Sequence, residues 1–98
     1  MSNDETTFEV DGREYHVKAL DGLFGMDLAI KLQDEQVTAA LIADVIIRSV
    51  VLKVGVADRK WFDKEFRRGA TRAAKLFGLI TTFNLGSEFE GDEEDPKE

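Results

Sequence analysis

The sequence contains no cysteine, and its 98 residues include only one histidine, one tryptophan, one tyrosine and one proline. The lack of cysteine excludes disulfide bonds, thiolate zinc sites, iron–sulfur clusters and a cysteine nucleophile. His16 alternates with apolar neighbours, and no HExxH or DxDxDG spacing accompanies it, so it is interpreted as a surface residue of a strand. We expect no metal and no cofactor. A chain of this length buries one core, which excludes a two-domain enzyme.

Residues with catalytic potential are equally sparse. The serines at positions 2, 49 and 87 fall at the start of the chain, in an apolar segment and in a polar tail, which are unsuitable places for a nucleophile. The segment 22–25 has two glycines but lacks the lysine and the preceding buried strand of a phosphate-binding loop. We therefore expect no catalytic residues and a non-enzymatic function.

Charge is unevenly distributed along the chain. Acidic residues outnumber basic ones by 20 to 13, which gives a net charge of -7. Residues 1–36 and 87–98 are strongly acidic, whereas residues 58–75 are basic. Duplex DNA and anionic membranes are repelled on average, so contact with either needs a local basic patch. The first twenty residues lack the apolar stretch of a secretory signal, which predicts a cytoplasmic protein.

The hydrophobic pattern predicts an α+β fold that is mostly α-helical. Apolar and polar residues alternate on both sides of Asp11–Gly12, a dipeptide typical of a two-residue hairpin turn. The apolar face of this hairpin consists of Phe8, Val10, Tyr15 and Val17. The expected elements are a β-hairpin over 7–18 packed on a bundle of about four helices near 22–33, 38–54, 58–68 and 70–85. We expect residues 1–86 to form a single globular domain, followed by a disordered acidic tail over 87–98 because Phe89 is its only large apolar residue.

The predicted helix 38–54 is apolar on nearly all sides. Thr38 suits its N-cap and Gly55 its C-terminal end. Asp44 and Arg48, one turn apart near its middle, argue against a membrane span and mark a narrow solvated stripe. Such a helix is either the centre of the core or partly an interface for a partner or a second copy, and both interpretations remain open.

The segment 58–75 combines aromatic and basic residues. Trp61, Phe62 and Phe66 lie among seven lysines and arginines, a composition that also occurs on nucleic-acid-binding surfaces. Aromatic rings that dock on a core while basic tips stay in water produce the same pattern. The alternative functions are therefore a small nucleic-acid-associated or regulatory protein-interaction domain that uses this segment, or the binding of an acidic partner, which includes the chain's own acidic tail.

Three segments, taken in chain order, resemble a known family. They read Phe8-x-Val10-Asp11-Gly12-x-x-Tyr15-x-Val17, then Ala19-Leu20-Asp21-Gly22-Leu23, and, after a central apolar helix, Ala74-Lys75-Leu76-Phe77-Gly78-Leu79-Ile80-x-x-Phe83-Asn84. Together with the acidic tail, this order resembles the small tail assembly chaperones of long-tailed bacteriophages. The resemblance covers about residues 8 to 86.

The resemblance implies a non-enzymatic chaperone. Such a protein binds the helical tape-measure protein in the host cell cytoplasm, helps to recruit tail-tube protein subunits, and is not expected in the mature virion. Self-association is expected, whereas contacts with membranes and nucleic acid are not. An amphipathic helical client needs apolar side chains that match its i, i+3, i+4 and i+7 positions. The residues predicted to bind a partner are Trp61, Phe62, Phe66, Arg67, Arg68, Phe77, Ile80 and Phe83.

Overall fold

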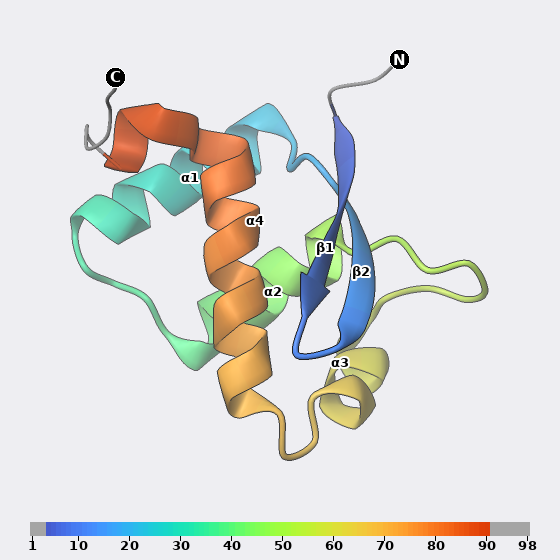
Figure 1. The fold of residues 1–98 in the computed structure, drawn as a ribbon. Helices are drawn as coiled ribbons and strands as arrows, with labels where there is room; N and C mark the ends of the chain where they lie inside the picture. Colours follow the sequence, from blue (N-terminus) through green and yellow to red (C-terminus); the bar gives the residue numbers. More distant parts are fainter. Residues whose placement is uncertain (1–3, 91–98) are drawn as a thin grey trace.

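An antiparallel hairpin and four helices make up the computed structural model, which describes residues 4–90 and, for 87–90, the backbone alone. The elements are β1 (Glu5–Val10), β2 (Arg13–Lys18), α1 (Gly22–Gln33), α2 (Ala39–Ser49), α3 (Arg59–Glu65) and α4 (Ala70–Glu90). In Figure 1 the hairpin stands on one side of α4 and α2 crosses behind it, while α1 and α3 lie near opposite ends of α4. The predicted hairpin and mostly helical α+β fold are confirmed.

The hairpin follows directly from its turn dipeptide. Asp11 and Gly12 have φ angles of 52° and 85°, both in the left-handed region that a type I′ turn requires. The strands begin at Glu5 rather than at residue 7. The side chains that face the helices are those predicted, with Val10, Tyr15 and Val17 buried and Phe8 half-buried against the core.

The core lies between the hairpin, α2 and α4. Its buried helical residues are Leu28, Leu41, Val45, Ile46, Phe66, Ala73, Leu76, Phe77 and Ile80. The interpretation of α2 as a central core helix is thus confirmed, and Asp44 and Arg48 form its exposed stripe. The Arg48 guanidinium lies 4.3 Å from the centre of the Phe24 ring, a cation–π contact that attaches α1 to α2. Within residues 4–90, no helix combines the length and the apolarity needed to cross a membrane.

The predicted helix 38–54 is too long. Its start is confirmed, since the Thr38 hydroxyl accepts a hydrogen bond from the N–H of Leu41 at 3.1 Å. Its end is wrong, because α2 stops at Ser49 and Val50 is already extended. The N–H of Val51 donates to the carbonyl of His16 at 2.8 Å, so these β-branched residues pair with the outer edge of β2 instead of continuing the helix.

The other helix ends also differ from the prediction. Gly55, expected to end the second helix, takes a φ of 85° inside the loop that precedes α3. α3 covers seven residues rather than 58–68, because the chain turns at Phe66. α4 continues to Glu90, although Gly86, with φ of 67° and ψ of −162°, interrupts its helical geometry. The remainder of the predicted tail, 91–98, lies outside the described residues.

Ser49 is a polar residue in the core. It is fully buried, and its hydroxyl has no hydrogen-bond partner in the part of the chain that the structure describes. A buried hydroxyl without a partner lowers stability. We expect Ser49→Ala to raise the free energy of unfolding by about 1 kcal/mol. Urea denaturation, followed by the fluorescence of the single tryptophan, measures the change. A comparable decrease would contradict this account of the hydroxyl.

Candidate protein-binding surfaces

The predicted partner-binding residues fall into three environments. Phe66, Phe77 and Ile80 are buried within this chain, so they form no exposed surface here, and their partner role stays a prediction. The hairpin, α2 and the remaining aromatic rings cover these side chains, and their helical stripe therefore serves the core of this chain. The half-buried residues, whose partner role stays a prediction, are Trp61, Phe62 and Phe83. The exposed residues are Arg67 and Arg68.

The aromatic residues of the basic segment form one cluster around Phe66. The Tyr15 ring stacks on Phe66 with a centroid distance of 5.8 Å. Trp61 and Phe62 contact the same ring from α3 at 5.9 Å and 4.8 Å. The Arg72 guanidinium of α4 lies 5.2 Å from its centre. These rings attach α3 to β2 and α4. They pack against one another and do not form an open surface on which nucleic-acid bases could stack.

A hydrogen-bond network covers this cluster. The hydroxyl of Tyr15 donates to Oε2 of Glu65 at 2.7 Å, and Nη1 of Arg13 donates to the same oxygen at 2.8 Å. Nε of Arg72 donates to the Tyr15 hydroxyl at 3.0 Å. Burial raises the pKa of Tyr15, and the bond to Glu65 raises this pKa further, while Arg72 opposes both. The network thus ties β2, α3 and α4 together through one carboxylate.

Tyr15→Phe removes the hydroxyl at the centre of this network. We expect a loss of about 1.5–3 kcal/mol in the free energy of unfolding at neutral pH, because the hydroxyl bonds two charged groups. The raised pKa means that folded Tyr15 holds its proton more tightly than the unfolded chain does. The contribution of this hydroxyl to stability is therefore fully present and constant below pH about 10, and it is lost as the pH rises through the folded pKa.

The alkaline part of this prediction can be assigned to one residue, because the chain has a single tyrosine. Tyrosinate absorbance, titrated in buffer and in denaturant, should give a higher pKa for the folded protein. Tyr15→Phe should reduce the alkaline loss of stability. Equal pKa values in the two states would contradict the predicted pH dependence.

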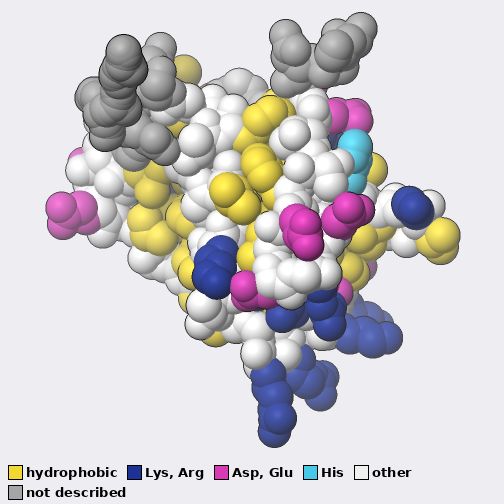
Figure 2. Space-filling model, in the orientation of Figure 1, with side chains coloured by type: hydrophobic (Ala, Val, Ile, Leu, Met, Phe, Trp, Pro, Cys, Tyr) yellow, Lys and Arg dark blue, Asp and Glu magenta, His cyan; other side chains and the backbone are white. Residues whose placement is uncertain are grey.

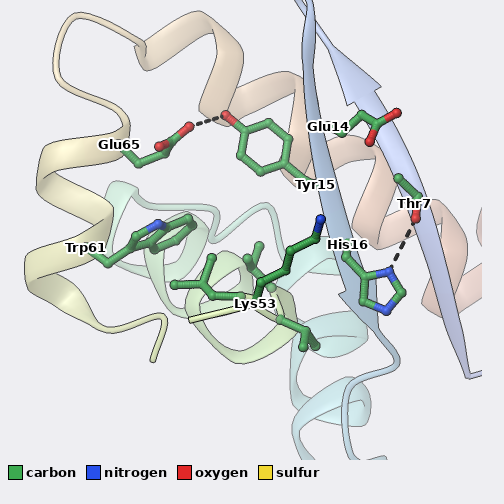
Figure 3. A pocket seen from close by; sticks show the side chains of 10 residues that line it. Thr7, Glu14, Tyr15, His16, Lys53, Trp61 and Glu65 are labelled. Carbon is green, nitrogen blue, oxygen red and sulfur yellow. Dashed lines mark hydrogen bonds between the residues drawn. The ribbon is translucent and has the colours of Figure 1, made fainter. Parts of the chain in front are cut away.

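A groove of about 630 Å³ opens beside this network, between β2, the segment after α2 and α3. Figure 3 shows Trp61 and Lys53 on either side of it. Two of its ionisable side chains already have partners, since Nε2 of His16 lies 2.9 Å from Glu5 and Glu65 belongs to the network above. Among residues 4–90, His, Asp and Glu side chains do not gather in groups of three that could hold a metal ion.

The largest apolar side chains left in solvent lie on α1. Leu23 is 79% exposed, Met26 60% and Ile30 52%. These three residues, at i, i+3 and i+7, share one side of the helix and are called the α1 apolar face below. The opposite side of α1 packs on the core through Phe24, Leu28 and Leu32. The apolar residues of this segment recur at both three- and four-residue spacings, a pattern in the sequence from which the second apolar side could have been recognised.

A second exposed apolar group lies on the loop between α2 and α3. Val54 is 87% exposed and Val56 76%. This loop projects from the body of the molecule on the side away from α1 (Figure 1). Its valines are therefore separate from the α1 apolar face.

The exposed basic residues gather at one end of the molecule. Figure 2 shows lysine and arginine side chains around α3 and the turn that leads into α4. Four of the basic residues at this end form no ion pair within the described residues, namely Lys60, Lys64, Arg67 and Arg68, and are called the basic end below. Comparison with family models, with curated proteins and with solved structures finds no match for the chain.

Proposed function

We propose that the protein is a non-enzymatic chaperone of phage tail assembly, and that its α1 apolar face binds an amphipathic helical segment of the tape-measure protein. The observation that carries the proposal is the exposure of Leu23, Met26 and Ile30 on a helix whose other side is packed on the core. A monomer gains nothing from leaving three large side chains in water, whereas a binding protein needs them there.

The spacing of the three residues favours a helical partner. At about 1.5 Å per residue they form a ridge roughly 10 Å long, which fits the groove between the side chains of a second helix. Met26 lies at the centre of the ridge, and an unbranched thioether adapts to differing client side chains. The face therefore suits a long client with many similar but non-identical apolar stretches.

One copy binds such a client weakly. Burying each of the three side chains contributes about 1.5–3 kcal/mol, and part of that gain is offset by the entropy lost on association. Several copies on one client would strengthen the complex through effective concentration. The net charge of -7 keeps such a complex in solution. The tail-tube recruitment, the host cytoplasm and the absence from the virion follow from the family resemblance.

The test is co-expression of the full chain with the product of the gene immediately downstream. We expect that product to be the tape-measure protein, a long helical protein. The variant Leu23→Gln/Met26→Gln/Ile30→Gln should recover at least about tenfold less of that protein in soluble complex, because glutamine keeps the helix but not the apolar contact.

A matched control is Val54→Gln/Val56→Gln, which removes equally exposed apolar side chains from the loop on the other side. It should leave the recovery of the client unchanged. Circular dichroism should show both variants folded. Equal recovery with the α1 variant, or a downstream gene that encodes no long helical protein, would overturn the proposal.

A further inference from the structure

The basic end stands out because its charges are unpaired. Other cations nearby have partners: Arg13 contacts Glu65 at 2.8 Å, Lys75 contacts Asp11 at 3.0 Å, and Arg59 approaches Asp63 at 3.6 Å. The basic end has no such partner within residues 4–90, and its four side chains are exposed on α3 and the turn after it. Four adjacent positive charges on a chain with a net charge of -7 form a local attractive site for an anionic segment.

The chain itself carries a matching segment. Residues 92–95 read Asp-Glu-Glu-Asp, four consecutive carboxylates. They follow α4, which runs away from the basic end: Ala70 lies beside it and Glu90 at the far end of the molecule (Figure 1). The two complementary groups are therefore attached to opposite ends of one helix.

This geometry disfavours contact within one chain. The part of α4 from Ala70 to Gly86 is about 24 Å long. The five peptide steps from Glu90 to Asp95 span at most about 18 Å when fully extended. The acidic segment can therefore meet its own basic end only when it is almost fully extended, whereas a neighbouring molecule can present its basic end directly.

We propose that the acidic segment Asp92–Asp95 of one copy binds the basic end of a second copy, so that the molecules associate head to tail. A head-to-tail contact leaves one free basic end and one free acidic segment in each pair, so it extends into chains or closed rings. The contact is electrostatic and exposed, and salt weakens it. It goes beyond the proposed client binding and does not depend on it.

Charge reversal tests the proposal on the full chain. The basic-end variant is Arg67→Glu/Arg68→Glu and the tail variant is Glu93→Lys/Glu94→Lys. Light scattering at low ionic strength should show that the wild type grows in mass with concentration and returns to the monomer in high salt. Each variant alone should associate at least about tenfold more weakly. An equimolar mixture of the two should associate in pairs, because the basic-end variant keeps its acidic segment and the tail variant keeps its basic end.

Two further variants control for loss of folding and for the change in net charge. Arg68 has a φ of 61°, a left-handed conformation that glycine adopts more easily, so Arg68→Gly removes a charge without straining the turn. It should weaken association while the melting temperature holds or rises. Lys18→Glu reverses one charge on β2, away from the basic end, and should leave association unchanged.

Several outcomes would overturn the proposal. These are association that ignores both charge reversals, a mixture that fails to restore it, or an effect of the tail variant that is independent of concentration, which would indicate contact within one chain. Binding of duplex DNA by the basic end without any self-association would also overturn it. Client recovery through the α1 apolar face is measured separately, so its failure leaves this result intact.

Discussion

Phe66→Ala is expected to lower the free energy of unfolding by about 3–5 kcal/mol. Phe66 is buried at the centre of the aromatic cluster, where the rings of Tyr15, Trp61 and Phe62 all contact it. Removing its ring leaves a cavity between α3, β2 and α4 that three rigid rings fill poorly. It also removes the surface on which the Arg72 guanidinium lies. Without the Phe66 ring, α3 should no longer pack against β2 and α4.

Urea denaturation followed by circular dichroism measures this loss, since Trp61 fluorescence changes with the cavity itself. Phe66→Leu, which keeps most of the buried volume, serves as the matched control and should cost clearly less. A loss below about 1 kcal/mol for Phe66→Ala, a value typical of surface substitutions, would return Phe66 to the list of partner-binding residues.

The parts of the fold that depend on local chemistry could be predicted from the sequence. The Asp11–Gly12 turn requires two residues with positive φ, and this dipeptide supplies them. The bounds expected for α1, near 22–33, agree with the observed ones, where Asp21 caps the start of the helix by accepting from the N–H of Phe24 at 2.8 Å and Asp34 follows its last turn. Thr38 marked the start of α2 for the same reason. In each case the signal lies within a few residues of the element.

The parts of the fold that depend on contacts between distant residues could not be predicted from the sequence. The end of α2 is set by the pairing of Val51 with His16, a partner 35 positions earlier, and no local pattern records that pairing. The apolar pattern, which continues past Ser49, therefore overestimated the length of the helix. The side chain of Asn84 makes another distant contact: it accepts from the N–H of Leu20 at 2.8 Å and attaches α4 to the segment before α1.

The candidate binding surface also shows what could be predicted from local sequence and what depended on distant contacts. Periodicity identified the apolar stripes of the chain, but it could not tell which stripe the hairpin would cover. The stripe of α4 is covered and belongs to the core, whereas the α1 apolar face is left open although its residues are similar in size and apolarity. Burial is decided by which elements meet in space, so the structure leaves a large exposed apolar face on α1, whereas the prediction placed the partner-binding residues on α3 and α4.

Ile80→Ala and Leu79→Ala test this assignment of faces on adjacent residues of one helix. Ile80 is fully buried, while Leu79 is 36% exposed beside the groove between α4 and β1. Ile80→Ala should lower the free energy of unfolding by about 2–5 kcal/mol, because it leaves a cavity between α4 and its neighbours in the core. Leu79→Ala should cost about 1 kcal/mol or less, since the side chain is already partly in water.

The comparison is well matched, because both changes shorten an aliphatic side chain to alanine at adjacent positions of α4. Neither change disturbs a helix cap. Urea denaturation of the two variants in one buffer gives the difference directly. Equal losses, or a larger loss for Leu79→Ala, would mean that α4 is rotated by about one residue, or about 100°, from the orientation described. That rotation would also expose Ile80, and with it the stripe that the sequence first assigned to a partner.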